Sequence, residues 1–131
     1  MRIIVMGGAG LAEQVARALH EAGDEVTVID TDRGREAELA KAGLRAVWGD
    51  ALVPSTLEAA GALRADVLVA CSRSDEDNLV VALLAKRHFD IPRVVARVND
   101  TANESLFTEA WGVDAVVSPS TTVVSAIRQR T

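Results

Sequence analysis

The chain opens with the stretch RIIVMGGAGLA at residues 2–12, in which a short apolar run meets a glycine-rich turn. From Ala12 to Leu19 the apolar residues recur every three or four positions, which is the spacing of a helix, and Gly23 ends this pattern. A buried strand, a tight turn and a helix form the first half of a βαβ unit. The stretch therefore predicts an α/β fold with a parallel sheet.

The same alternation of strand-like and helix-like patterns continues along the chain. Short β-branched apolar runs predict six strands, at residues 2–6, 25–30, 44–48, 65–71, 93–98 and 114–118. Helical spacing between them predicts crossover helices, the last over residues 102–111. Because such crossovers are right-handed, we expect a Rossmann-like, doubly wound, six-stranded parallel sheet with the strand order 3-2-1-4-5-6.

Residues 1–118 are predicted to form this single domain, and residues 119–131 a C-terminal helical extension. The extension carries Val123, Val124 and Ile127 at helical spacing, and an isolated helix of this length is marginal in water. We expect it to pack on a partner subunit or to lead into a further domain. Together with Leu106, Phe107 and Trp111, these apolar residues could form a self-complementary dimer patch. The alternative for Leu106 and Phe107 is that they belong to the core.

Composition restricts the possible functions. The formal charge is −5, from 14 Lys and Arg against 19 Asp and Glu, so there is no basic excess to attract nucleic acid or an anionic membrane. The single cysteine, Cys71, cannot form an internal disulfide, and two histidines far apart make no zinc motif. The longest apolar run, residues 79–85, is far shorter than the ~20 residues of a membrane span. We expect a cytosolic protein without bound metal, nucleic acid or membrane insertion.

The glycine-rich turn can be aligned with a phosphate-binding motif in two registers. Gly7-x-Ala9-x-x-Ala12 places a small residue where the helix packs on the strand, whereas Gly8-x-Gly10-x-x-Glu13 would place a bulky one there. The first register is favoured, although Ala9 then stands where glycine normally lets backbone amides approach a pyrophosphate. The alternative is a glycine-rich turn that binds no ligand.

Asp30 strengthens the ligand interpretation. It closes the second strand 23 positions after Gly7, close to the ~20 expected for a carboxylate that binds a ribose diol. Its charge would repel a 2′-phosphate, which favours NAD(H) or another adenosine nucleotide over NADP, although Arg33 and Arg35 lie nearby. The alternative is that Asp30 or Asp32 only caps the next helix, which is the more favoured role for Asp32.

Groups for catalysis are scarce. The chain has no Tyr, and its His and Lys residues all fall late in predicted helices, at the edge of the sheet away from the ligand. These residues are His20, His88, Lys41 and Lys86. No His is placed to activate Cys71. We therefore expect no catalytic residue and no enzyme activity, with the cofactor domain of an NAD-dependent oxidoreductase as the alternative.

A receiver-like phosphoacceptor domain is a further alternative. Asp50, Ser72 and Arg97 follow the third, fourth and fifth strands, where such domains carry Asp, Ser or Thr, and Lys. However, Gly7 and Gly8 stand where a metal-binding acidic pair is expected, and Arg97 is not Lys. This alternative is disfavoured.

Motifs along nearly the whole chain together resemble the TrkA-N domain, also called the RCK N-terminal domain. They are RIIVMG at 2–7, VIDTD at 28–32, GDA at 49–51, DEDNL at 75–79, ARVN at 96–99 and GVDAVVSP at 112–119. The resemblance implies a cytosolic regulatory domain that binds NAD(H) or ATP/ADP and controls a membrane potassium channel or a Trk/Ktr-type transporter. It also implies a homodimer or higher ring at the inner face of the membrane.

The resemblance implies roles for individual residues as well. Gly7, Ala9 and Leu11 would face the phosphates and Asp30 the ribose, with Gly10 and Thr31 in the same two turns. The remaining positions are Asp50 and Ala51 on the adenine side and Ser72 and Arg97 in the far part of the crevice.

Three positions depart from the pattern of this family. Ala9 replaces the middle glycine, Gly10 replaces an Arg or Lys that meets phosphate in many members, and Ser120 replaces a Glu. These departures bear on nucleotide affinity, on a preference for ATP and on divalent-ion binding.

Overall fold

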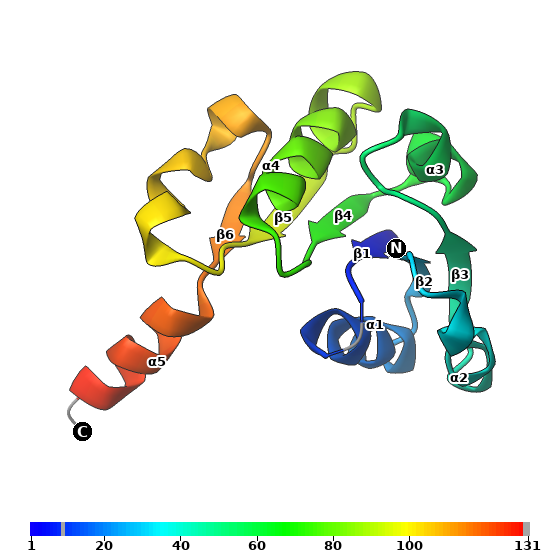
Figure 1. Cartoon of the computed structure of the whole chain (residues 1–131), viewed down its shortest axis with the longest axis horizontal. Helices are drawn as coiled ribbons and strands as arrows, with labels where there is room; N and C mark the ends of the chain where they lie inside the picture. The colour runs from blue at the N-terminus through cyan, green and yellow to red at the C-terminus, as the bar shows by residue number, and fades with distance from the viewer. Residues whose placement is uncertain (9, 130–131) are drawn as a thin grey trace.

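The computed structural model describes residues 1–8 and 10–129. Its centre is a six-stranded parallel sheet in the order β3-β2-β1-β4-β5-β6 (Figure 1), so the predicted Rossmann-like fold and strand order are confirmed. The strands are β1 (Arg2–Met6), β2 (Glu25–Asp30), β3 (Arg45–Trp48), β4 (Val67–Ala70), β5 (Arg93–Arg97) and β6 (Ala115–Val117).

Helices connect all the strands. The α-helices are α1 (Leu11–Glu21), α2 (Glu36–Lys41), α3 (Pro54–Ala59), α4 (Asp75–Leu83), which η3 (Leu84–His88) continues as a π-helix, and α5 (Pro119–Arg128). Short 3₁₀ turns are η1 (Arg33–Arg35), η2 (Ala62–Arg64), η4 (Thr101–Leu106) and η5 (Glu109–Trp111). None of the helices in the described part of the chain is long and apolar enough to cross a membrane.

The helix predicted over residues 102–111 is wrong, because this segment forms the two 3₁₀ turns η4 and η5. The Asp100 side chain accepts a hydrogen bond from the Ala102 amide, and Asn103 Nδ2 donates to Asp75 Oδ2 at 2.9 Å. Phe107 then leaves the helical region (φ −82°, ψ 72°) and turns into the core, while Leu106 and Trp111 stay 46% and 37% exposed.

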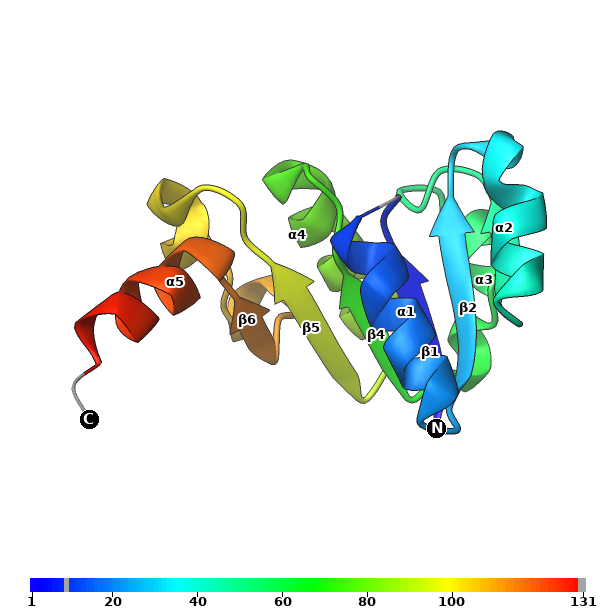
Figure 2. The same cartoon turned by 90° about the horizontal axis from the view of Figure 1, so that it is seen from below.

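Two helical layers enclose the sheet (Figures 1 and 2). On one face α3 and α4 cover the larger core cluster, which includes Ile4 and Leu68; on the other, α1 and α2 cover a smaller cluster that includes Val5 and Val28. Neighbouring residues of β1 thus point to opposite cores, which explains its unbroken apolar sequence. Parallel strands direct all their carboxyl ends to one edge, which we call the carboxyl edge.

Helix coverage is incomplete on the α1 face. Here β4, β5 and β6 together with α1 border an apolar groove of about 400 Å³, lined by residues such as Leu11, Val69 and Val117. Helix α5 extends away from the sheet (Figures 1 and 2). Its residues Val123 and Ile127 are 58% and 77% exposed. The chain therefore presents two unpartnered apolar surfaces, the groove and α5.

Candidate functional site

A crevice of about 180 Å³ opens at the carboxyl edge, beyond β1, β2, β3 and β4. It includes the boundary between β1 and β4, where the strand order reverses and where open α/β sheets bind ligands, and it extends over the ends of β2 and β3. Six residues predicted from the sequence line it: Gly7, Asp30, Thr31, Asp50, Ala51 and Ser72. Other residues of the lining were not predicted as site residues from the sequence. They include Gly8, Gly49, Leu52 and Asp77.

The turn between β1 and α1 is shaped by Gly7. A Cβ at this position would lie 2.6 Å from Ala12 Cβ and 2.7 Å from the Cys71 carbonyl oxygen, so only glycine fits. Ala12 is buried at this contact, which confirms the first register of the motif. Gly10 is the N-cap of α1 with φ 92°, and it has no side chain to cover the first-turn amides. The turn can therefore offer backbone N–H groups and the positive end of a helix dipole to an anion.

Asp30 is the buried carboxylate of the crevice, with its side chain only 4% exposed. Oδ1 accepts a hydrogen bond from the Asp32 amide at 2.9 Å, and Oδ2 accepts one from Arg35 Nη1 at 2.7 Å. Asp32 instead caps η1 through the Gly34 amide, as expected for that residue. Each carboxylate oxygen of Asp30 keeps a second lone pair, so a ribose diol can still donate to it.

Arg35 links Asp30 to the first helix. Its Nη2 lies 2.7 Å from Glu13 Oε2, and its Nε lies 3.8 Å from Glu38 Oε2. The arginine side chain is 11% exposed, so three carboxylates surround one nearly buried guanidinium. Its charge is already balanced within the protein. The sequence did not predict the pairing of Glu13 with Arg35, because the two residues come together only in the folded chain.

The loops after β4 and β5 are joined by a buried amide. Asn78 is fully buried; its Nδ2 donates to the Arg97 carbonyl oxygen at 2.8 Å, and its Oδ1 accepts from Ser72 Oγ at 2.8 Å. Asp75 accepts hydrogen bonds from the Asn99 amide at 2.6 Å and from Asn103 at 2.9 Å. Ser72 is thus held at the wall of the crevice by the protein itself.

We expect Asp75 to make the stability of these loops depend on pH. Burial alone would raise the pKa of its carboxyl, but hydrogen bonds from Asn103, Asn99 and Asp100 outweigh burial and lower the pKa below the ordinary value of 3.8. A group with a lowered pKa in the folded state stabilises above its unfolded pKa, and this contribution is lost as the pH falls through the folded pKa. Asp75→Asn should therefore flatten the loss of unfolding free energy in acid.

The measurement is urea denaturation between about pH 5 and pH 2. Glu76→Gln removes a carboxylate from the same first turn of α4 and is the matched control, since Glu76 is exposed. Equal slopes for Asp75→Asn and the unchanged protein would show that the hydrogen bonds to Asp75 do not stabilise the fold.

Three predicted site residues lie outside the crevice lining. Gly10 is at the N-cap of α1, while Leu11 and Arg97 line the apolar groove together with Cys71. Ala9 lies outside the described residues. Arg97 points to this groove because it shares the face of β5 with Val95 and Arg93, which also line it. Contact of these residues with a ligand stays a prediction.

The candidate catalytic groups lie away from the crevice. Burial raises the pKa of the Cys71 thiol, against the opposing charge of Arg97, so the thiolate is disfavoured. His20 is in the last turn of α1 and His88 at the end of η3. Lys86, expected to be solvated, is instead ion-paired with Asp114.

Comparison with known proteins identifies the family. The model of the TrkA-N domain matches residues 3–119. The chain belongs to the TrkA-N domain family. Among curated relatives of this TrkA-N domain, the Trk system potassium uptake protein TrkA of Mycobacterium tuberculosis is 42% identical over 98% of the chain. The chain spans 59% of the length of that relative.

Solved structures show the same fold as this TrkA-N domain. The TrkA-N domain of the inner membrane protein ybaL from Escherichia coli is 20% identical, covers 96% of this chain and 93% of its own, and has a TM-score of 0.87. The GsuK channel bound to NAD is 20% identical, covers 96% of this chain and 22% of its own, and has a TM-score of 0.80.

Proposed function

We propose that this TrkA-N domain binds an adenosine nucleotide, NAD(H) or ATP/ADP, in the crevice and thereby regulates a membrane potassium channel or transporter. The observation that carries the proposal is Asp30, a nearly buried carboxylate that lines the crevice at the end of β2, beside the turn that Gly7 shapes. A buried charge is costly unless it is paired and hydrogen-bonded, as Asp30 is. Here the partner, Arg35, leaves acceptor capacity on Asp30 that a ribose diol would use.

The geometry supports one orientation of the nucleotide. Phosphates would lie at the N-terminus of α1, where Gly8 and Gly10 leave the backbone uncovered. The ribose would bind Asp30. The adenine would lie toward Asp50 and Ala51, where the Asp50 side chain holds the loop by accepting from the Leu52 amide at 2.9 Å.

The surroundings of Asp30 support NAD(H) or ATP/ADP rather than NADP. A 2′-phosphate would meet the Asp30 carboxylate, which repels it. Two cations follow Asp30 in η1: Arg33 is exposed, and the guanidinium of Arg35 is already paired with Asp30, Glu13 and Glu38. We therefore infer that Arg35 positions Asp30 and does not accommodate an additional phosphate.

The regulatory part of the proposal rests on relatives. A TrkA protein of a potassium uptake system is 42% identical, and GsuK, a structural neighbour, is a channel solved with NAD. We infer a cytoplasmic domain without enzyme activity, held at the inner face of the membrane by a channel or transporter subunit. The nucleotide would change the packing of such an assembly, with a coupling of about 1–3 kcal/mol.

We further propose that two copies associate, with α5 of one copy in the apolar groove of the other. The groove is lined mainly by apolar side chains such as Val69, Val95 and Val117, with Arg93 and Arg97 beside them, and α5 carries exposed Val123 and Ile127. Each surface lacks a covering element within the described residues. If α5 of each copy occupies the groove of the other, both apolar surfaces of each copy are buried. The interface is then self-complementary, as a two-fold dimer requires.

Ile127→Asp should shift the chain toward monomer, because it places a charge in an apolar contact. Sedimentation equilibrium at tens of micromolar measures the change. Ser125→Asp adds the same charge on the opposite side of α5 and is the control, which should remain associated. A strictly monomeric unchanged protein, or equal behaviour of both variants, would contradict this dimer.

Calorimetric titration with NADH, NAD, ATP and ADP tests the proposed ligand. We expect saturable binding of at least one of them to the unchanged protein. No heat of binding up to millimolar nucleotide would leave a purely structural domain and would overturn the proposal. Turnover of a hydroxy acid with NAD would instead favour the oxidoreductase alternative.

A further inference from the structure

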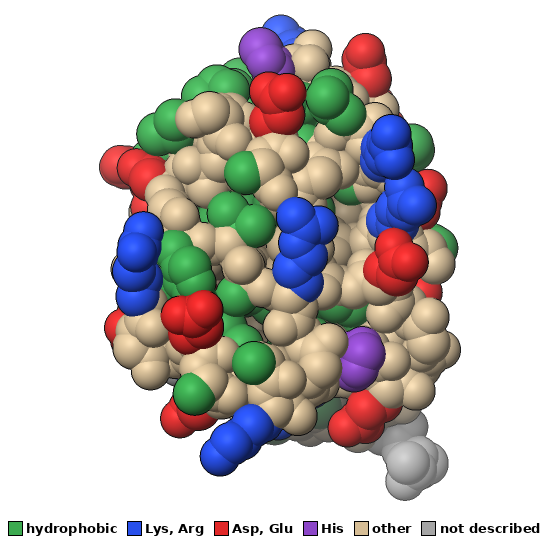
Figure 3. All heavy atoms as spheres, turned by 90° about the vertical axis from the view of Figure 1, so that its right-hand side faces the viewer, with side chains coloured by type: hydrophobic (Ala, Val, Ile, Leu, Met, Phe, Trp, Pro, Cys, Tyr) green, Lys and Arg blue, Asp and Glu red, His purple; other side chains and the backbone are tan. Residues whose placement is uncertain are grey.

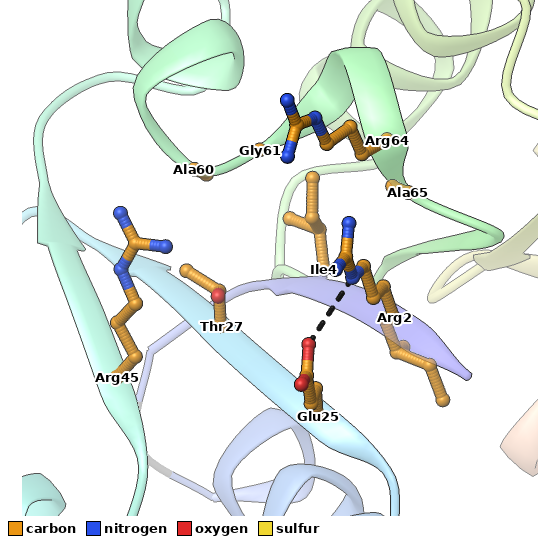
Figure 4. A pocket seen from close by; sticks show the side chains of 10 residues that line it. Arg2, Ile4, Glu25, Thr27, Arg45, Ala60, Gly61, Arg64 and Ala65 are labelled. Atoms are coloured by element: carbon orange, nitrogen blue, oxygen red, sulfur yellow. Dashed lines mark ion pairs between the residues drawn. The ribbon is translucent and has the colours of Figure 1, made fainter.

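A second cavity lies at the opposite edge of the sheet from the crevice. It has a volume of about 280 Å³ and is formed where β1, β2 and β3 begin and where α3 ends and η2 follows. Three arginines from different elements line it: Arg2 of β1, Arg45 of β3 and Arg64 of η2 (Figure 4). We call it the arginine cavity. No part of it contributes to the crevice around Asp30.

The arginine cavity has an excess of positive charge. Its one carboxylate, Glu25, lies 3.2 Å from Arg2 Nε and is itself 76% exposed, so this ion pair is weak. Arg45 donates to the Ala59 carbonyl oxygen at 3.3 Å. Within residues 1–8 and 10–129, Arg64 makes no ion pair. Among the lining residues, three guanidinium groups stand against one carboxylate. Asp66 lies outside the lining but accepts a hydrogen bond from the Arg2 amide at 2.8 Å and borders the adjoining hollow with Arg64, so the net charge is about +1 when it is counted.

This concentration of arginine is local. The chain as a whole carries −5, and the face that includes the β3 edge carries Asp and Glu as well as Lys and Arg (Figure 3). The interior of the arginine cavity is apolar, whereas its rim carries the charged side chains. Ile4, Ala60 and Ala65 are buried and apolar, and the Thr27 side chain stands among the arginines (Figure 4).

We propose that the arginine cavity binds a small phosphorylated anion, with a diphosphate group as the recognised unit. Guanidinium groups present forked N–H donors that match the oxygens of phosphate. A single carboxylate offers two acceptor oxygens and one negative charge. A diphosphate offers enough acceptor oxygens and negative charges to bind three arginines. The diphosphate could be inorganic or part of a nucleotide, whose apolar part would then contact Ile4 and Ala60. This site is independent of the proposed binding at Asp30.

Residue-resolved NMR of the full chain tests the proposal, with inorganic diphosphate as the probe and ADP in a second arm. Saturable shifts of the amide signals of Thr27, Gly61 and Arg64 are expected with diphosphate. If ADP shifts them as strongly, the diphosphate of a nucleotide is the recognised source; if only inorganic diphosphate does, the free anion is. Asp30→Asn should leave these shifts unchanged, which separates this site from the crevice.

Arg64→Gln should weaken diphosphate binding at the arginine cavity about fivefold, as expected for one partly exposed charge. Arg64 is exposed and unpaired in the described structure, so the variant should fold, and its spectrum shows whether it does. Arg128→Gln makes the same charge change on α5 and is the matched control, which should bind like the unchanged protein. Equal weakening by both variants, shifts confined to the crevice, or no shift at millimolar diphosphate would each overturn the proposal.

Discussion

Asp30→Asn is expected to weaken adenosine-nucleotide binding by about tenfold to hundredfold, which corresponds to the ~1.5–3 kcal/mol of a hydrogen bond to a charged group. The variant keeps the shape of the side chain but replaces one carboxylate oxygen by an amide nitrogen. The ribose diol then loses an acceptor. Because asparagine is neutral, the variant also loses the ion pair between Asp30 Oδ2 and Arg35 Nη1, which lie 2.7 Å apart in the unchanged protein. Calorimetric titration of both proteins with the same nucleotide measures the difference.

Arg35→Gln separates the two effects of the Asp30 variant. It breaks the same ion pair but leaves the Asp30 carboxylate and its hydrogen bond from the Asp32 amide in place. We expect this variant to lose stability and to weaken nucleotide binding less than Asp30→Asn does, because the carboxylate remains although its positioning partner is removed. If Arg35→Gln weakens binding as much as Asp30→Asn does, the ion pair and not the carboxylate determines affinity. If neither variant changes binding, the ligand does not contact Asp30.

Gly7→Ala should have the largest effect on the fold, with a loss of about 1–3 kcal/mol of unfolding free energy. The added methyl would lie 2.6 Å from Ala12 Cβ and 2.7 Å from the Cys71 carbonyl oxygen. One of these contacts belongs to α1 and the other follows β4, and neither can retreat as a flexible side chain could. The turn must then move away from the crevice. Urea denaturation and nucleotide titration should both record the change.

Gly8→Ala is the matched control, because it adds the same methyl one residue later. A Cβ there would meet no other described atom within 4 Å, and Gly8 is not among the glycines with positive φ. Its stability should be unchanged or slightly higher, since alanine restricts the unfolded chain. Equal destabilisation by both substitutions would show that the turn is sensitive to any side chain and that the contact with Ala12 is not specific.

The fold could be predicted from the sequence because its signals are local. Apolar runs such as residues 2–6 and 25–30 and the helical spacing after Ala12 fix strands and helices, and the handedness of crossovers then orders the strands. The contact between Gly7 and Ala12 could be predicted for the same reason, because the spacing of the motif indicates which residues must be small where the helix packs on the strand.

The rest depends on tertiary contacts. The segment 102–111 has a helical pattern, yet its backbone leaves the helical region at Phe107, whose side chain is buried in the core. The pairing of Glu13 with Arg35 likewise exists only after α1 and η1 have packed together. Arg97 is different, because its shared parity with Val95 could have placed it on the α1 face. Arg97 is the last residue of β5, so the alternation along the strand decides which face its side chain lies on.

Amide NMR of the full chain titrated with ADP and with NAD tests the central claim most directly. The claim predicts saturable shifts at the carboxyl edge, in the signals of Gly7, Gly8, Gly10, Thr31 and Ala51. Unchanged signals at these positions with millimolar nucleotide, or shifts that occur only elsewhere in the chain, would contradict a nucleotide site in the crevice.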